Sequence, residues 1–368
     1  MRLPLTLSVY IGRQYLMSVL FILGMLMIIA GLLDSVELLR RTASKSEATF
    51  GVTMEMVLFK FPNMAEKLLP FAALIGGMMA LSRLTRSHEL IVARAAGVSV
   101  WQFMAPAFIS MFIFGTLFVA AWNPLSAAMA ARYEKLEAKY LAGRASLLEV
   151  SPSGLWLRQV EEGDVLEKEH IIHALSVSDQ GMRLRHVTIF TFDKDAQFLN
   201  RVDADEAHLE KGYWRVSDVL LTRPGQPAER MPEKTLNTQL TIAQLQDSFA
   251  SPRTLSFWAL PGFIKALEAA GFSALRHKLH WYATLATPFM LCAMAFLAAG
   301  FSLRLPRRGG TKGMIAAGVF TGFILYFLTD IVQALGLSGS IPVQLAAFAP
   351  SIIIMFVSAA VLLHMEDG

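Results

Sequence analysis

The chain has 368 residues, of which 54% are hydrophobic and 17% are charged, whereas about 25% of the residues of ordinary soluble domains are charged. The formal net charge is +4 at pH 7, and no nucleic-acid-binding motif accompanies it. This composition excludes an ordinary soluble domain and predicts an α-helical integral membrane protein. Because Cys292 is the only cysteine, an intrachain disulfide is also excluded.

Three membrane-spanning helices are predicted in the first third of the chain, at residues 16–33, 57–82 and 98–122. The first run is uncharged and close to the length of about 20 residues that crosses a hydrocarbon core of about 30 Å. It has no small-residue cleavage site, so we expect it to remain as a helix and not to be removed as a signal peptide. The second run contains Glu66 and Lys67, which we expect at the membrane interface or facing a polar cavity.

A long polar insert follows, at residues 125–280. Residues 127–142 are rich in alanine and carry charges in a helical pattern, which predicts that the third helix continues outward as a stalk. Residues 146–245 change to short alternating runs separated by turn signals, which predicts an antiparallel sandwich or open barrel. The aromatic residues expected to anchor its core are Trp156, Phe190, Phe192 and Trp214.

The last part of the chain returns to the membrane. An amphipathic helix is predicted at residues 257–270 and ends at a glycine. Asp330 lies within the fifth apolar run, where a carboxylate normally faces a cavity or a partner. The alternative, which we favour, is that the fifth helix ends near Thr329 and leaves Asp330 among the lipid headgroups. The three apolar runs that follow the amphipathic helix are residues 281–303, 313–329 with a continuation past Asp330, and 341–364.

Lysine and arginine are distributed unevenly over the short loops. Most of them lie on the side of the N-terminus, of the loop after the second helix and of the loop after the fourth, whereas the opposite loops carry mainly Arg40, Arg41 and Lys45. The positive-inside rule therefore predicts that both termini are cytoplasmic and that the insert lies on the other side. The predicted domains are residues 1–124 with helices one to three, residues 125–280 as the insert, and residues 281–368 with helices four to six.

Residues 83–98, with the sequence RLTRSHELIVARAAGV, connect the second and third helices. Apolar residues recur there at helical spacing, while Arg83, Arg86 and Glu89 lie on another face, as in an amphipathic helix. Such a helix can rest against a membrane domain and present Arg86, His88 and Glu89 to a soluble partner. The alternative is a plain connecting loop whose arginines mark the cytoplasmic face and whose Glu89 pairs with Arg86.

Motifs for catalysis are absent from the sequence. It contains no GxxxxGK[ST], GxSxG, HExxH or CxxC pattern, so no catalytic residue and no cofactor is assigned to this chain. Two HxxH pairs occur, His170 with His173 and His277 with His280. Neither pair has a third ligand beside it, and no metal site is predicted.

Several longer blocks resemble the LptF/LptG permeases of lipopolysaccharide exporters. They are YIGRQYL before the first helix, FPNMAEKLLPFAALIGGMMALSRL in the second, SHELIVARAAGVS after it, LPGFIKALEAAGF in the return helix and GSIPVQLAAFAPS before the sixth. The resemblance covers the whole chain. The block SHELIVARAAG is the most specific, and GVFTGFILYFLTD favours the LptG branch of the family.

This resemblance implies a fold, a location and partners. The fold is six transmembrane helices with a periplasmic all-β jellyroll-like domain, in the inner membrane of a Gram-negative bacterium. The implied assembly is a heterodimer with an LptF-like permease on two LptB-like subunits, which bind and hydrolyse ATP. Lipopolysaccharide would enter a cavity between helices one and five of the two permeases and pass to the β-jellyroll and an LptC/LptA-like bridge.

The resemblance also implies roles for individual residues. Glu89 takes the position of the carboxylate that couples the permease to the ATPase, with Arg86, His88 and Arg94 around it. Asp34 departs from the family pattern, because some relatives carry a lysine there, and this weakens any phosphate contact at that position. The residues that fall where the family's basic residues surround the phosphorylated headgroup are Arg40, Arg41, Arg132 and Lys135.

An apolar wall for acyl chains is expected from one face of the first and fifth helices, although such a stripe can also serve helix packing. The residues expected in this wall are Leu26, Ile29, Phe320, Ile324 and Phe327.

Two other classes of function remain open. A membrane enzyme would need an acid–base cluster, which only Glu66, Lys67 and His280 suggest. A non-transporting scaffold, which docks periplasmic partners through a sheet edge, would explain the insert but not the amphipathic helix.

Overall fold

The structure is a computed structural model of the chain. It describes residues 5–43, 49–89, 92, 95, 97–142, 148–151, 154–161, 168–178, 183–195, 197–210, 212–238, 251–269, 273–302 and 311–366. The chain divides into two compact units. The helical unit comprises Met1–Gly143, Arg253–Trp258 and Lys278–Gly368, and the sheet unit comprises Arg144–Pro252 and Ala259–His277.

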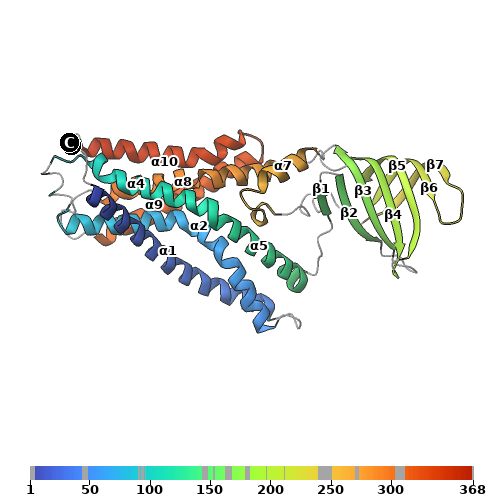
Figure 1. The fold of residues 1–368 in the computed structure, drawn as a ribbon, viewed down its shortest axis with the longest axis horizontal. Helices are drawn as coiled ribbons and strands as arrows, with labels where there is room; N and C mark the ends of the chain where they lie inside the picture. The colour runs from blue at the N-terminus through green and yellow to red at the C-terminus, as the bar shows by residue number, and fades with distance from the viewer. Residues whose placement is uncertain are drawn as a thin grey trace. The chain divides into compact units, whose positions relative to one another are not determined.

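The helical unit contains the expected membrane-spanning helices. Within the described part of the chain, six helices are long and apolar enough to cross a membrane (Figure 1), which confirms the predicted six-helix organisation. One of them is a composite, in which α4 (Val100–Leu117) continues through a π-helical turn (Phe118–Trp122), α5 (Asn123–Glu137) and a second π-helical turn (Ala138–Ala142). The other five are α1 (Leu5–Thr42), α2 (Phe50–Arg86), α8 (Leu275–Ser302), α9 (Thr311–Leu337) and α10 (Val343–Glu366).

The core of the helical unit is built around α2, which packs against α1, α5 and α9. Two adjacent glycines let α1 come close: a Cβ added at Gly76 would lie 2.6 Å from the Cα of Val19, and one added at Gly77 would meet the hydroxyl of Tyr15. Small residues are what permit such close helix contacts in membranes. The largest fully buried side chains of this core include Ile11, Tyr15, Leu69, Leu74, Met78, Met104 and Met111.

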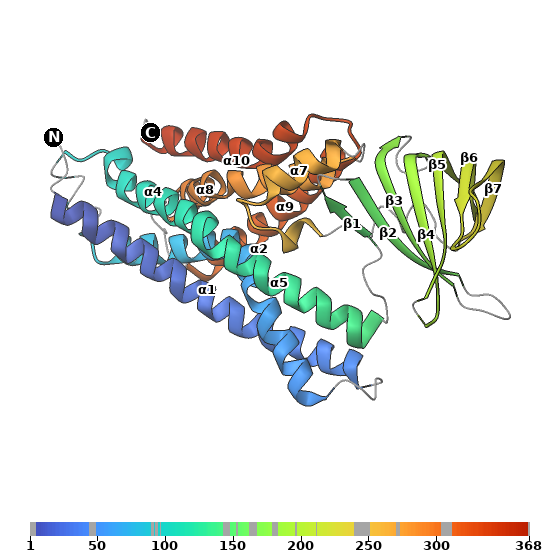
Figure 2. The ribbon, with the colours of Figure 1, turned by 45° about the vertical axis from the view of Figure 1, so that its right-hand side comes forward.

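The sheet unit is one antiparallel sheet in which each strand pairs with the next along the chain. The strands can be followed in order from β1 to β7 in Figure 2. This confirms the predicted all-β insert. The helix α7 (Leu260–Ala269) contacts β1 within this unit. The strands are β1 (Leu148–Ser151), β2 (Gly154–Glu161), β3 (Lys168–Ser178), β4 (Arg183–Asp193), β5 (Phe198–Glu210), β6 (Tyr213–Thr222) and β7 (Glu229–Asn237).

One face of the sheet forms the core, and of the four predicted aromatic anchors only Trp214 lies fully within it. Trp214 is fully buried, as expected. Trp156 is 38% exposed because its neighbours Leu155 and Leu157 are the buried residues of β2, and successive side chains of a strand point to opposite faces. Phe190 is only half-buried for the same reason, since it follows the buried Ile189. Phe192 is half-buried as well.

Candidate functional site

The C-terminal part of α1, the N-terminal half of α2 and α5 form a small three-helix extension of the bundle. Its own core contains Leu38, Met56 and Val57, with Tyr133 of α5 packed against them. The hydroxyl of Thr53 donates a hydrogen bond to the hydroxyl of Thr42, at 3.1 Å, between α2 and α1. These contacts explain why α1 and α2 continue beyond their apolar runs, and they fix the charged side chains at this end of the bundle.

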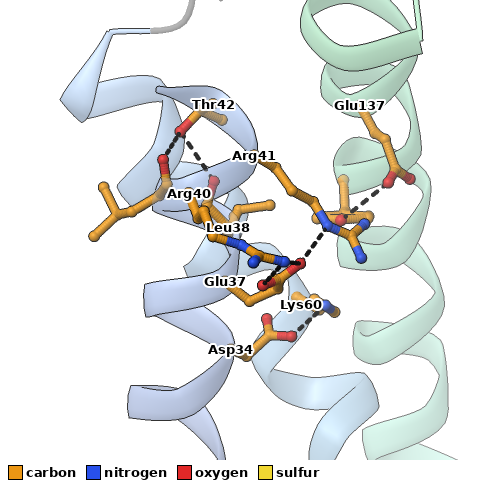
Figure 3. A network of polar contacts seen from close by, with 10 residues as sticks. Asp34, Glu37, Leu38, Arg40, Arg41, Thr42, Lys60 and Glu137 are labelled. Atoms are coloured by element: carbon orange, nitrogen blue, oxygen red, sulfur yellow. Dashed lines mark hydrogen bonds and ion pairs between the residues drawn. The ribbon is translucent and has the colours of Figure 1, made fainter. Parts of the chain in front are cut away.

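Ion pairs line the α1 side of this extension (Figure 3). The carboxylate of Glu37 accepts from Arg40 and from Arg41, with N–O distances of 3.0 Å in both pairs. The ammonium of Lys60, on α2, lies 2.5 Å from the carboxylate of Asp34. Because the Arg40 and Arg41 side chains are 78% and 59% exposed, both guanidinium groups remain accessible to a ligand.

The α5 side contributes further cations. The guanidinium of Arg132 lies over the ring of Phe59, and the ammonium of Lys60 lies over the ring of Tyr133, each 5.7 Å from the ring centroid. Lys135 is exposed one turn further along α5. We refer to five residues at this end of the bundle as the basic collar: Arg40, Arg41, Lys60, Arg132 and Lys135.

The basic collar contains one residue that sequence reasoning missed. Lys60 lies 26 positions from Asp34 in the sequence, so no local pattern indicates that the two side chains meet. The contact also gives a physical role to Asp34, the position that departs from the family pattern: its carboxylate neutralises Lys60 within the chain.

The five residues expected in an acyl-chain wall lie on α1 and α9, which both pack against α2. Leu26 is half-buried and packs against the bundle core. The other four are exposed apolar side chains, and α9 is the least buried of the six spanning helices. The exposed members are Ile29, Phe320, Ile324 and Phe327.

The segment between α2 and α4 differs from the single amphipathic helix predicted at residues 83–98. Arg83 and Arg86 belong to the last turn of α2, which ends at the C-cap Ser87, and His88 follows with a positive φ of 61°. Glu89 comes after this break. Its carboxylate accepts hydrogen bonds from the Ser87 hydroxyl at 2.8 Å and from the Tyr10 hydroxyl of α1 at 3.3 Å.

Arg86, His88 and Glu89 are therefore close together at one end of the bundle, before, at and after the point where the helix α2 ends. Arg94 lies outside the described residues. The helix break could have been suspected from the sequence, because Ser87 and His88 are poor continuations of a helix compared with the residues around them.

Glu66 and Lys67 line a cavity between helices, one of the two places expected from the sequence, but most of its wall is apolar and not polar. Asp330 lines the same cavity, and α9 continues to Leu337. The favoured prediction that the fifth helix ends near Thr329 is therefore wrong, and the structure agrees with the alternative in which the Asp330 carboxylate faces a cavity. Among the residues that the structure describes, no group of three or more His, Cys, Asp or Glu side chains is placed to hold a metal ion.

The sequence profile of the family described as "Lipopolysaccharide export system permease LptF/LptG" matches residues 9–364. The chain belongs to this LptF/LptG family. The match spans both the helical and the sheet unit, so the insert is part of the family architecture. The protein is accordingly a multi-pass membrane protein of a lipopolysaccharide export permease family.

Individual relatives agree with the family match. The lipopolysaccharide export system permease protein LptG of Escherichia coli strain K12 is 25% identical over 364 residues, which cover 96% of this chain and 97% of the relative. The LptG protein of Haemophilus influenzae strain Rd is 24% identical over 358 residues, 95% of each chain. The likeness to LptG permeases therefore extends over nearly the whole chain.

Proposed function

We propose that this chain is the permease subunit of an ABC transporter that extracts lipopolysaccharide from the outer leaflet of the inner membrane and passes it to a periplasmic bridge. A separate cytoplasmic ATPase drives the cycle. The observation that carries the proposal, beyond family membership, is the position of the basic collar at the end of α1, a helix with large apolar side chains that the described part of the chain leaves exposed.

The uncovered faces of α1 and α9 suit a lipid path shared with a second permease of the same family. Each presents large apolar side chains at helical spacing, such as Phe21 and Ile28 on α1 and Phe323 and Phe327 on α9. An apolar face can contact acyl chains without desolvation cost. We assign Leu26, Ile29, Phe320, Ile324 and Phe327 to this path, with Leu26 at its inner wall.

The basic collar is suited to the phosphorylated headgroup. Arginine binds phosphate through paired, charge-assisted hydrogen bonds, and Arg40 and Arg41 share a single carboxylate, Glu37, so one of the two can turn to a phosphate while the other keeps its partner. Lys60 is already neutralised by Asp34. We therefore expect Arg40, Arg41 and Arg132 to contribute more to headgroup affinity than Lys60.

The contact between Glu89 and Tyr10 supports a route for coupling to the ATPase. The hydrogen bond ties the segment after α2 to the first turns of α1, and α1 runs without a break to Arg40 and Arg41. At 1.5 Å per residue this helix links two points that are about 45 Å apart. A partner that pulls on Glu89, flanked by Arg86, His88 and Arg94, can in this way move the basic collar.

The test is purification of the chain from its native membrane with its partners, followed by ATPase and lipid-export assays in liposomes that contain lipopolysaccharide. We expect Arg41→Ala to reduce export and leave ATPase association intact, and Glu89→Ala to reduce the coupling between hydrolysis and export. Matched controls are Arg13→Ala, at the other end of α1, and Glu55→Ala, an exposed residue of α2. Normal export in both test variants would contradict the proposal.

The second candidate is a scaffold that binds periplasmic partners through the sheet and transports nothing. It is favoured by the outer strands β1 and β7, each of which pairs with one neighbour among the described strands, since a sheet edge can add a partner's strand. Purification of the chain without any ATPase would favour the scaffold over the transporter.

A further inference from the structure

A cavity of about 260 Å³ lies inside the helical unit, between α2, α8, α9 and α10. Its size is near the lower end of the range of about 300–1,000 Å³ for ligand pockets in proteins. A volume of this size holds a segment of an acyl chain. Most of the wall is apolar and includes Phe71, Leu74, Ala286, Met290, Met294 and Leu325.

One part of the wall is charged. Glu66 and Lys67 come from α2, Asp330 comes from α9, and Arg253 comes from the segment before α7. The carboxylate of Glu66 accepts a hydrogen bond from the side-chain amide of Asn123, at 3.3 Å. The charge of Glu66 attracts both Lys67 and Arg253, and its carboxylate has a hydrogen-bond partner in Asn123.

Lys67 and Arg253 differ from Glu66 in this respect. Among the residues that the structure describes, neither has a hydrogen bond or an ion pair, and none joins either of them to Asp330. The two cationic groups are close enough for their charges to repel each other. Both side chains are exposed at the cavity, so their N–H groups can donate charge-assisted hydrogen bonds to an anionic group that enters it.

Arg253 is held at the cavity by the segment that follows it. The backbone N–H of Phe257 donates to the Asn123 side-chain oxygen at 2.7 Å, and the indole N–H of Trp258 donates to the carbonyl of Ala120 at 3.2 Å. The ring of Phe257 also stacks on Trp281, with 5.7 Å between centroids. Because Asn123 is 4% exposed, this attachment is part of the packed helical unit.

We propose that this cavity is a lipid-binding site within the single chain, in which one acyl chain lies against the apolar wall and its phosphate lies between Lys67 and Arg253. The site differs from the basic collar. Lys60, the collar residue on α2, pairs with Asp34, and it lies two turns of the helix, about 10 Å, from Lys67. The chemistry is that of an acyl chain joined to a phosphate. Both a bilayer phospholipid and the exported lipid can supply it, so the proposal does not depend on the transport function.

The first test measures bound lipid. The full chain, with the partners that purify with it, is titrated with phosphatidylglycerol and examined by native mass spectrometry. We expect Lys67→Gln and Arg253→Gln each to weaken lipid binding roughly tenfold, because each removes a charge-assisted hydrogen bond. Thr287→Phe, which adds a ring to the cavity wall, is expected to remove binding at this site.

Two variants serve as matched controls. Lys265→Gln removes a positive charge from an exposed position of α7, and Leu285→Phe adds a ring to the same helix as Thr287 at an exposed position. Both are expected to bind lipid as the unmodified chain does. If the three test variants also retain lipid at that level, the proposal is wrong.

The second test needs no substitution. Phosphatidylglycerol with a photoreactive group in its acyl chain is reconstituted with the protein, and the labelled positions are read by peptide mass spectrometry. We expect a label on Met294, which is 5% exposed and which only a chain inside the cavity can reach, besides the label on Phe289, which is 40% exposed and open to any bilayer lipid. Label on Phe289 without Met294 would refute the site.

Two further probes identify the ligand. If added lipopolysaccharide removes the Met294 label, the occupant is the exported lipid, and if the label persists, it is the bilayer phospholipid. Both results support the site. A photoreactive diacylglycerol, which lacks the phosphate, should label Met294 much less, and equal labelling would overturn the role given to Lys67 and Arg253.

Discussion

The helices α2 and α9 are both apolar, but α2 is largely buried within the chain and α9 is largely exposed. Over half of the most apolar window of α2 is buried, whereas α9 packs mainly against α2 and α10 and keeps most of its large side chains exposed. Apolar composition therefore predicts that a helix crosses the membrane. It does not predict whether the helix packs in the core of the bundle or stays exposed to lipid or to a partner. The predictions below test this contrast.

The largest effect is expected where α1 and α2 are closest. Gly76→Leu places a Cβ 2.6 Å from the Cα of Val19 and 2.9 Å from the carbonyl oxygen of Ser18, so backbone must move. We expect a loss of about 3 kcal/mol or more in the free energy of unfolding, measured as denaturation in mild detergent. Gly24→Leu is the control, because a Cβ there meets nothing within 4 Å.

The contrast between core and uncovered helix is tested directly by two truncations to alanine. Met104→Ala, in the core, should cost about 2–5 kcal/mol of unfolding free energy because it leaves a cavity. Phe327→Ala, at a residue of α9 that is 69% exposed, should change it by less than about 0.5 kcal/mol. A similar cost for both would show that α9 is packed within the chain.

The attachment of Arg253–Trp258 to the bundle should give an intermediate effect. Asn123→Leu leaves the Phe257 N–H and the Glu66 carboxylate without their partner, which should cost about 2–3 kcal/mol. Gln344→Leu, at an exposed amide of α10, is the control. Tryptophan fluorescence, to which Trp281 next to Phe257 contributes, is a suitable measurement of the melting curve. An unchanged curve would contradict the role of Asn123.

The smallest effect is expected in the sheet unit, from a pair between exposed side chains. A hydrogen bond from Arg230, together with its charge, holds the pKa of Asp218 below the ordinary Asp value. A carboxyl group with a lowered native pKa stabilises the fold above its unfolded pKa of about 3.9, and this stability is lost as the pH falls through the lowered native pKa.

Arg230→Gln should therefore lower the melting temperature of the sheet slightly at pH 7 and should lose less on acidification than the unmodified chain. The buried Trp214 reports the transition. Arg185→Gln, whose partner Glu206 is 3.7 Å away, is the comparison. Equal acid sensitivity of the Arg230→Gln variant and the unmodified chain would mean that the pair does not contribute.

The elements of the fold were predictable because their signals are local. Long apolar runs indicated the six helices, and alternating runs indicated the sheet. The ends of the elements were less predictable: α1 and α2 continue past their apolar runs because Leu38, Met56 and Val57 pack with α5, and α2 stops at Ser87 inside what sequence periodicity presented as one helix.

The candidate sites were predictable only in part, for a related reason. Arg40, Arg41 and Arg132 were assigned by resemblance, but the pairing of Lys60 with Asp34 depends on how two helices cross. Arg253 lies in a segment with no helical or strand pattern, and Asn123 and Ala120 bring it to the cavity from about 130 residues away in the sequence. Contacts of this kind leave no periodicity.

The π-helical turn at Phe118–Trp122 changes the phase of one long helix. A π-helical turn holds one more residue than the α-helical turn it replaces, and each residue of an α-helix corresponds to about 100° of rotation. The apolar stripe of α4 and the charged stripe of α5 are therefore offset around a common axis. A deletion of one residue in this turn would realign the two stripes and would turn Arg132 away from Phe59, although every side chain of the basic collar would still be present.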